Sequence, residues 1–226
     1  MRQQPDATQG HVPRPGETWR PVADRPTVLT VHLAEARRAR AHVPPGLRVV
    51  EMPRGRTPAC VFLSRYGPGS TLEYSELVVM PASARGAGTW GMWVSHIYVD
   101  SGLSVEGGQA VFGLPKELAE FAWESGTPGS AVVTRGGQAL ARLAWGRPAL
   151  AIPLPMRGRA LSLRGGEVMT AAHALRGRGG PTRVALTIPP NSPLAALGLG
   201  RPLLGIVAAA MRGAMGLDQR VHGRQR

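Results

Sequence analysis

The sequence predicts an α+β fold that is mainly antiparallel β, with a few helices flanking the sheet. Short apolar runs recur along the 226 residues and are separated by Gly, Pro and Ser. Two of these separators are Gly-Gly pairs, which favour tight hairpin turns. The strands do not alternate with long helical patterns, which argues against βαβ units. An apolar content of 43% suffices for the core of one domain.

The first convincing strand is expected at residues 27–31, where the apolar run TVLTV begins. Hairpins are expected around Gly136-Gly137 and around Gly165-Gly166, because glycine adopts the positive φ angles that such turns require. The remaining expected strands are residues 47–51, 59–66, 74–80, 90–99, 105–112, 131–135, 138–145, 160–164, 167–172 and 183–188.

Two helices are predicted from composition. Residues 33–41 (LAEARRARA) have high helix propensity, and the Pro-Pro-Gly at residues 44–46 ends the pattern. Residues 202–217 predict one long helix after the sheet, with Gly205 and Gly213 as weak points.

The chain is divided into three parts. Residues 1–26 are polar and rich in proline and are expected to form a flexible arm, residues 27–221 a single domain, and residues 222–226 a basic tail.

The N-terminal segment has no apolar core typical of a signal peptide. The one cysteine, Cys60, excludes an internal disulfide. The most apolar stretch is interrupted by Arg212 and is shorter than the roughly 20 residues of a membrane span. We expect a cytoplasmic protein that does not insert into membranes.

The net charge of +13 suggests an anionic partner, but its distribution argues against nucleic acid. The arginines are scattered along the chain, and aromatic residues for base stacking make up only 5%. Enrichment in Ala, Gly, Pro and Arg is typical of a GC-rich coding sequence. A nucleic-acid-binding protein is therefore the least favoured of the alternatives.

No motif indicates a metal or a cofactor. The sequence has no HExxH zinc motif, dinucleotide-binding fingerprint, phosphate-binding loop or GxSxG nucleophile elbow. The six histidines are widely separated. We expect neither a metal nor another cofactor.

The most informative residue is Lys116, because it is the single lysine among 27 basic residues. A guanidinium stays protonated, whereas a desolvated lysine amine can lose its proton and attack a carbonyl to form a Schiff base. The chain uses arginine at its other basic positions, where charge alone is needed. The retained lysine therefore indicates amine chemistry at Lys116. The alternative is a lysine that persists by chance at the start of a helix after Pro115.

Three segments around this lysine resemble the acetoacetate decarboxylase superfamily: residues 98–100 (YVD), 107–108 (GG) and 112–116 (FGLPK). The resemblance implies that Lys116 is the Schiff-base nucleophile. Weaker similarity extends over residues 27–221. It implies a curved sheet or cone-shaped β-barrel with a few flanking helices, assembled into a homo-oligomer.

The resemblance also implies the other site residues. The upstream segment YSE places the family's active-site glutamate at Glu76. Glu106 and Glu117 are reserve acids. The expected substrate-binding residues, which would line an apolar pocket or lie in the core, are Phe112, Leu114, Tyr74, Tyr98 and His96.

The sequence departs from the family pattern at three places, one of which is the absence of a family glutamate near residues 61–63. Glu117 stands where the decarboxylases have a second lysine, so desolvation has to lower the pKa of the amine. The arginine that holds the substrate carboxylate is replaced by Leu33, with His32 beside it. Arg37 or Arg38 could substitute only after a shift in register.

We therefore expect a lysine Schiff-base enzyme acting on a keto acid or ketone, either a decarboxylase or an aldolase, dehydratase or cyclase. The alternative is a non-catalytic barrel that binds a small apolar ligand. A catalyst requires Lys116 to be buried beside Glu76. A binding protein can leave Lys116 exposed or paired with Glu120.

Overall fold

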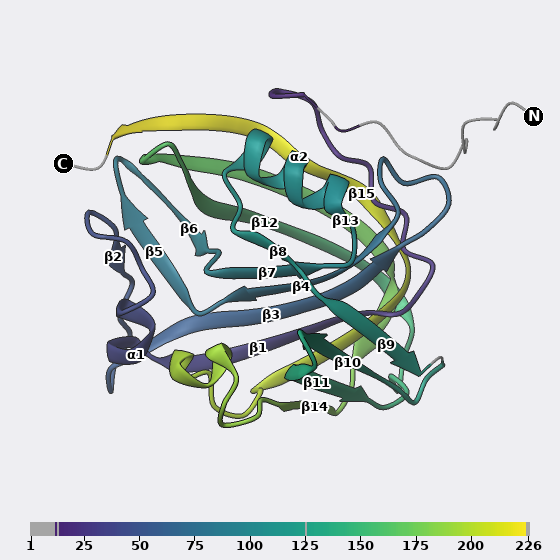
Figure 1. The fold of residues 1–226 in the computed structure, drawn as a ribbon. Coiled ribbons are helices and arrows are strands. Elements are labelled where there is room, and N and C mark those ends of the chain that lie inside the picture. The colour runs from purple at the N-terminus through teal and green to yellow at the C-terminus, as the bar shows by residue number, and fades with distance from the viewer. Residues whose placement is uncertain (1–11, 13, 125, 225–226) are drawn as a thin grey trace, which may run out of the picture.

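The computed structural model describes residue 12, residues 14–124 and residues 126–224 (Figure 1). Its elements follow in chain order: β1 (Thr27–Glu35), α1 (Ala36–Arg40), β2 (Arg48–Val49), β3 (Arg56–Tyr66), β4 (Tyr74–Met80), β5 (Ala82–Gly86), β6 (Thr89–Trp93), β7 (His96–Val99), α2 (Gly102–Phe112), β8 (Lys116–Leu118), β9 (Glu120–Glu124), β10 (Gly129–Arg135), β11 (Gln138–Trp145), β12 (Ile152–Arg164), β13 (Glu167–Pro181), β14 (Val184–Thr187), η1 (Pro193–Leu197) and β15 (Leu204–Arg224).

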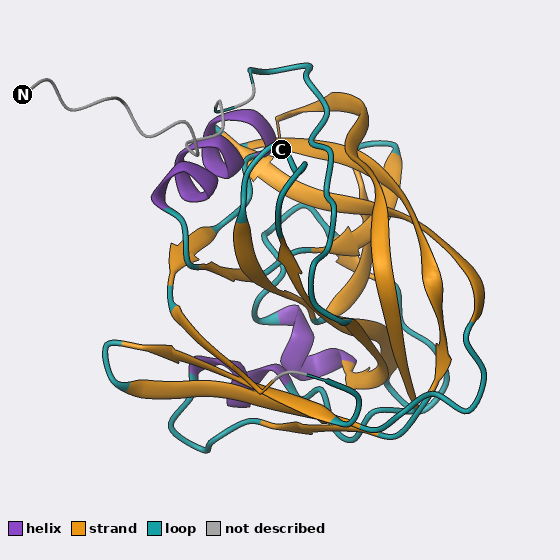
Figure 2. Cartoon of the chain, turned by 90° about the vertical axis from the view of Figure 1, so that its right-hand side faces the viewer, coloured by secondary structure: helices purple, strands orange, loops and turns teal. Residues whose placement is uncertain are grey.

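The strands form two sheets, and the predicted fold class, mainly antiparallel β with a few helices, is confirmed. The large sheet has 11 strands in the order β2-β5-β6-β12-β13-β15-β1-β3-β4-β7-β8, and the small sheet has four, β14-β11-β10-β9. Pairing is antiparallel except for the parallel pairs β6–β12 and β7–β8. The large sheet curls around an interior (Figure 2). Its order begins at β2 and ends at β8, so in the described residues it is an open curved sheet rather than a closed barrel.

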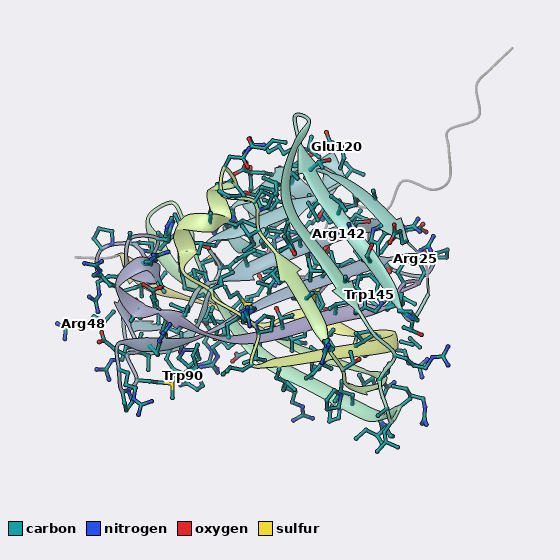
Figure 3. All side chains as sticks on the ribbon, turned by 90° about the horizontal axis from the view of Figure 1, so that it is seen from below. Arg25, Arg48, Trp90, Glu120, Arg142 and Trp145 are labelled. Carbon is teal, nitrogen blue, oxygen red and sulfur yellow. The ribbon has the colours of Figure 1, made fainter. Side chains whose placement is uncertain are left out.

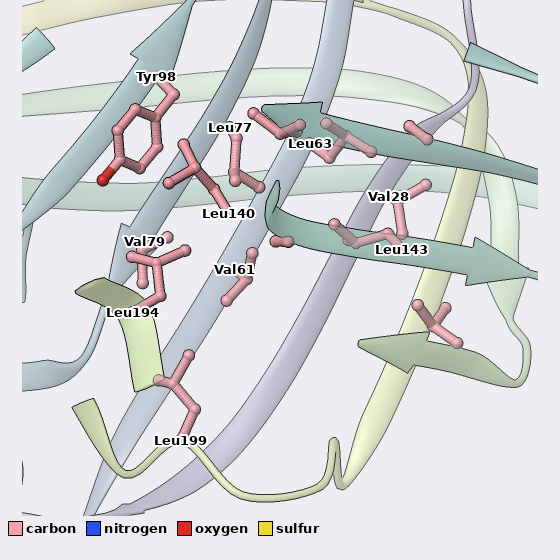
Figure 4. Packing of buried hydrophobic residues seen from close by; sticks show 14 of the residues in the cluster. Val28, Val61, Leu63, Leu77, Val79, Tyr98, Leu140, Leu143, Leu194 and Leu199 are labelled. Atoms are coloured by element: carbon pink, nitrogen blue, oxygen red, sulfur yellow. The ribbon is translucent and has the colours of Figure 1, made fainter. Parts of the chain in front are cut away.

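Strand β4 is buried on both faces, because the large sheet curls around one face and the small sheet covers the other. All seven of its residues are buried. Leu77 and Val79 pack with Leu143 of the small sheet in one apolar cluster (Figure 4). Val78 and Met80 belong to a second cluster inside the curve of the large sheet. The near-continuous apolar run of β4 is thus explained by burial on two sides.

Both predicted glycine hairpins are confirmed. Gly136 and Gly137 connect β10 to β11 with φ angles of 56° and 77°. Gly165 and Gly166 connect β12 to β13 with φ angles of 58° and 84°. Residues with a Cβ atom rarely adopt these angles, so the glycine pairs determine where the strands reverse.

The helix predicted at residues 202–217 is wrong, because this segment is the greater part of strand β15. Its glycines allow close packing of neighbouring strands: a Cβ on Gly205 would lie 2.5 Å from Val184. The strand pairs with β13 on one side and β1 on the other. These long-range hydrogen bonds outweigh the local helix propensity of its alanines.

The strand predicted at residues 105–112 is also wrong, because this segment lies in helix α2. The Ser101 side chain caps the helix by accepting a hydrogen bond from the amide of Ser104, and Gly113 ends it in the left-handed region with φ 60°. The helix predicted at residues 33–41 is shortened to α1, since residues 33–35 continue β1. None of the described helices is long and apolar enough to cross a lipid bilayer.

Part of the predicted arm, residues 1–26, runs along β15. The amide of Trp19 donates to the carbonyl of Met215 at 2.8 Å, and the amide of Ala23 donates to that of Met211 at 2.7 Å. Trp19 is only 3% exposed. Residues 1–11 and 13 of the arm, and residues 225–226 of the predicted tail, lie outside the described residues. The boundaries at residues 26 and 221 remain predictions.

Charged side chains are spread over the outside of the molecule (Figure 3). Arg48 and Arg142 are both exposed and lie on different parts of the surface. The arginine excess is thus scattered in space as it is in sequence.

We expect Gly137→Ala to reduce the free energy of unfolding by about 1–2 kcal/mol, because a Cβ disfavours the left-handed region. A Cβ at this position would meet nothing within 4 Å, so the loss reports backbone conformation alone. Gly137→Asn is the matched control and should lose less, since asparagine tolerates this region. Urea unfolding measures both, and equal losses would contradict the explanation.

Candidate active site

Lys116 is placed in the interior by the alternation of strand β8. It pairs with Ile97 of β7 in parallel register, and its side chain is 2% exposed. Successive side chains of a strand point to opposite faces, so Glu117 points away from Lys116 and forms an ion pair with Arg135 of β10. The family's second-lysine position is thus occupied by a residue that does not contact the amine.

The amine of Lys116 is held by polar side chains from two elements, β4 and α2. Its Nζ lies 3.0 Å from Oε2 of Glu76 on β4. It donates to Oγ of Ser104 on α2 at 2.9 Å and to the hydroxyl of Tyr74 at 3.3 Å. Glu76 is 5% exposed and also accepts hydrogen bonds from Tyr66 at 3.1 Å and from Tyr74 at 3.3 Å. The arrangement is a buried ion pair whose polar atoms are partnered.

Aromatic rings surround the same amine. Nζ of Lys116 lies 4.8 Å from the ring centroid of Trp19 and 4.7 Å from that of Tyr74, within the range of cation–π attraction. Trp19 makes edge contacts with Tyr74 and with Phe112 at the end of α2. Trp19 therefore helps to exclude water from Lys116.

The adjacent glycines of helix α2 allow the helix to approach this site closely. A Cβ on Gly107 would lie 3.0 Å from the Trp19 ring, and one on Gly108 would overlap the Lys116 side chain. The Gln109 side chain donates to the carbonyl of Lys116 at 3.0 Å. The Gly-Gly pair is thus required by packing against the lysine and the tryptophan.

Burial has opposite consequences for the two kinds of group in this cluster. It lowers the pKa of Lys116, and the nearby Glu76 carboxylate opposes this shift. It raises the pKa of Tyr66 and Tyr74 well above 10, and Glu76 adds to that shift. The tyrosines therefore remain protonated donors, while the amine can be neutral closer to physiological pH than an exposed lysine.

Lys116, Glu76 and Tyr74 line a cavity of about 390 Å³ inside the curve of the large sheet. Phe112 and Leu114, the other residues expected from the FGLPK segment, also line it. A carbonyl compound entering this cavity meets an amine, a carboxylate and a tyrosine hydroxyl on one side.

The sequence profile of the acetoacetate decarboxylase family matches residues 4–157. The chain belongs to this family. The family's fold extends over the whole domain: the acetoacetate decarboxylase of Legionella pneumophila aligns with a TM-score of 0.68 and 14% identity, covering 96% of this chain and 92% of the other.

Two further relatives broaden this comparison. MppR, an enduracididine biosynthesis enzyme complexed with the condensation product of pyruvate and imidazole 4-carboxaldehyde, aligns with a TM-score of 0.62 and 16% identity, covering 94% of this chain and 91% of the other. The protein NEOXANTHIN-DEFICIENT 1 of Oryza sativa subsp. japonica is 35% identical over 91 residues, which are 40% of this chain. The match spans only 30% of that rice protein.

Tyr98 and His96, expected as substrate-binding residues, lie outside the cavity lining. Ile97, between them on β7, lines the cavity, so its neighbours point to the opposite face. Tyr98 packs in the core cluster that faces the small sheet. Nδ1 of His96 lies within hydrogen-bond distance of the Ser95 hydroxyl. Burial, with a smaller contribution from the nearby His42, lowers the pKa of His96 to about 4.

The two reserve acids are also away from the cavity. Glu106 is exposed on α2, and Glu117 pairs with Arg135 on the opposite face of β8. Glu76 is therefore the acid in contact with Lys116.

The residues at or near the position of the family's carboxylate-binding arginine, namely His32, Leu33, Arg37 and Arg38, do not line the cavity either. His32 is buried against Thr30, and Arg38 on α1 pairs with Glu35 at the surface. Instead, Arg157 of β12 and His173 of β13 line the cavity. Sequence reasoning missed both, as it missed Trp19 and Tyr66, because long-range strand pairing brings them to the site. It also missed Ser104, which the packing of α2 against β8 brings to the lysine.

We expect Gly108→Ala to reduce the free energy of unfolding by about 1–3 kcal/mol, because its Cβ overlaps the buried Lys116 side chain. Gly102→Ala in the same helix meets nothing within 4 Å and should be neutral or stabilising by up to about 1 kcal/mol. Urea unfolding of the two variants separates packing from helix propensity. Equal stability of the two would contradict the close approach.

We expect Glu76→Gln to lower the pKa of Lys116 further, because the carboxylate that raises it is removed. The rate of Lys116 acetylation by acetic anhydride should then reach its half-maximum at a lower pH than in the unsubstituted protein. The N-terminal α-amine of the same molecule is the internal control and should keep its profile. A half-maximum at unchanged or higher pH would show that Glu76 does not act on the amine.

Proposed function

We propose that the protein is a lysine Schiff-base enzyme in which Lys116 condenses with the carbonyl group of a keto acid, ketone or aldehyde. The observation that carries this proposal is a lysine amine that lines a cavity, is 2% exposed and lies 3.0 Å from a carboxylate. Activated lysine nucleophiles in enzymes depend on such desolvation. The proposal accounts for the single lysine of an otherwise arginine-based sequence.

The first step uses the Lys116–Glu76 pair. A proton passes from the ammonium to the carboxylate, leaving a neutral amine and a neutral acid without a change in net charge. The nitrogen lone pair then forms a bond to the carbonyl carbon, and the amine proton lost on addition moves to the former carbonyl oxygen. Glu76 returns its proton to the resulting hydroxyl group, which leaves as water, so that the products are an iminium ion and a carboxylate.

The iminium ion is the branch point between several reactions. It can accept the electron pair of a breaking C–C bond, as in decarboxylation or retro-aldol cleavage. It also acidifies the neighbouring C–H bond, which permits dehydration, aldol addition or cyclisation. The two enzymes with similar folds are named as an acetoacetate decarboxylase and as a biosynthesis enzyme complexed with a pyruvate condensation product. Both names are compatible with reactions that proceed through an iminium ion.

Tyr66 and Tyr74 position Glu76 for these proton transfers. Each donates to a different carboxylate oxygen, Tyr66 to Oε1 and Tyr74 to Oε2. Tyr74 is also within hydrogen-bond distance of the amine. The carboxylate is therefore held at the nitrogen where protons are released and returned.

A barrel that binds an apolar ligand with Lys116 incidental is the second candidate. That function permits an exposed lysine or a pair with Glu120. Lys116 is buried, and Glu120 lies on β9, where it accepts a hydrogen bond from Thr134. These contacts favour the catalyst. The homo-oligomer and the cytoplasmic location stay predictions.

Borohydride trapping tests the proposed function. The protein is incubated with pyruvate or acetoacetate, reduced, digested and analysed by mass spectrometry. We expect a stable secondary amine on Lys116 that is more abundant than the adduct on the N-terminal α-amine, because burial lowers the pKa of Lys116.

A matched variant moves the single lysine to the surface. Lys116→Arg combined with Arg142→Lys keeps the composition and places the amine at a position with 56% side-chain exposure. The new lysine should form no more adduct than the N-terminal amine. Equal trapping at the buried and the surface lysine, or no adduct on Lys116 with any keto acid, ketone or aldehyde, would exclude the Schiff-base function.

A further inference from the structure

We propose that the cavity takes a neutral aldehyde or ketone carrying an extended apolar chain, with the carbonyl group at Lys116 and the chain directed along β4 toward Met80. This inference rests on the proposed function and specifies its substrate class. The observation that supports the inference is the distribution of polar and apolar side chains along the cavity.

Strand β4 shows this distribution directly. Its alternate residues Tyr74, Glu76, Val78 and Met80 all line the cavity. The first two contact the Lys116 amine, and the next two are apolar. The Cα atoms of Glu76 and Met80 are four residues apart in an extended strand, or about 13 Å. The apolar part of the cavity therefore continues well beyond the reacting atoms.

The neighbouring strand β3 lines the same path. Phe62 pairs with Val78, and Cys60 pairs with Met80, and both face the cavity. Leu29 of β1 lies opposite Phe62 in the register and also lines it. Three adjacent strands thus present apolar side chains beyond Glu76.

Methionines complete the apolar lining from distant parts of the chain. Met80, Met92, Met156 and Met215 all line the cavity, which is half of the eight methionines in the sequence. Methionine side chains are flexible and polarisable and adapt to irregular apolar surfaces. Such a lining suits a hydrocarbon chain better than a compact, charged molecule.

The exposure of the lining residues shows where the cavity meets solvent. Lys116 and Glu76 are 2% and 5% exposed, whereas Pro155 and Arg157 of β12 are exposed. The amine and the carboxylate therefore lie in the buried part of the cavity. The exposed Arg157 guanidinium can remain hydrated.

The charges of the lining disfavour a carboxylate beside the reacting carbonyl. Glu76 is the acid nearest to the amine, and a second carboxylate there would be repelled. Arg157 is exposed, and burial lowers the pKa of His173, which leaves this side chain neutral near pH 7. Among the described lining residues, Lys116 is thus the buried cation, and its charge, which the iminium ion retains, is already paired with Glu76.

The experiment compares acetaldehyde, butanal, octanal and pyruvate in the borohydride assay. The ratio of Lys116 adduct to N-terminal adduct is measured against concentration, so that the α-amine corrects for the intrinsic reactivity of each compound. Burying one methylene group contributes about 0.8 kcal/mol, or roughly fourfold in affinity. We expect the half-saturating concentration at Lys116 to fall at least about 100-fold from acetaldehyde to octanal.

Two variants locate the chain-binding part. Met80→Trp fills the cavity beyond Glu76 and should raise the half-saturating concentration of octanal by at least about tenfold. Met52→Trp, at a surface residue with 42% exposure, is the matched control and should leave it unchanged. If Met80→Trp fails to fold, the comparison of chain lengths on the unsubstituted protein still tests whether the cavity binds an apolar chain.

The possible outcomes separate the two proposals. Adducts on Lys116 that do not depend on chain length, or that form with pyruvate at lower concentrations than with octanal, overturn the apolar substrate and retain the Schiff-base enzyme. Adducts on Lys116 with none of the compounds overturn both. A steep chain-length dependence that Met80→Trp abolishes supports both.

Discussion

Two opposite charges, on Lys116 and Glu76, lie 3.0 Å apart in the interior of this protein. Removing charges from water is costly, and their mutual attraction compensates only if the remaining hydrogen-bonding atoms have partners. Ser104, Tyr66 and Tyr74 provide those partners. The surrounding structure therefore has to bring strand β4, helix α2 and the end of β3 together around one ion pair. Buried ion pairs contribute little to stability by themselves, and buried titratable pairs of this kind are typical of functional sites.

The double burial of β4 connects stability with chemistry. One face of the strand packs Leu77 and Val79 against the small sheet, while the other presents Glu76 and Val78 to the cavity. The small sheet contributes no residue to the cavity lining among the described residues, yet it holds the strand that carries the carboxylate. A slip of one residue in the β3–β4 register would exchange the two faces and withdraw Glu76 from the amine.

Local chemistry made part of the fold and site predictable. The glycine pairs predicted two hairpins because the positive φ angles of a tight turn are a local requirement. Lys116 was recognised because it is the single lysine of the sequence. Helix α2 was mistaken for a strand because its serine cap is a weaker signal than the apolar run it precedes. Strand β15 was mistaken for a helix because pairing with β13 and β1 overrides alanine propensity. Likewise, no local sequence pattern places Ser104 at the Lys116 amine or Arg157 at the cavity.

Trp19 comes from the stretch of sequence whose composition predicts a flexible arm. Its ring lies 4.8 Å from the amine and packs against Gly107 of α2, so the chain supplies one wall of the cavity from outside the predicted domain. A shortened protein beginning at residue 27 would retain the sheet, the lysine and the glutamate but would admit water at this wall. Hydration favours the ammonium over the free amine, so the pKa of Lys116 would rise. Such a protein could fold with the Lys116–Glu76 pair in place and still have a less nucleophilic amine at neutral pH than the full chain.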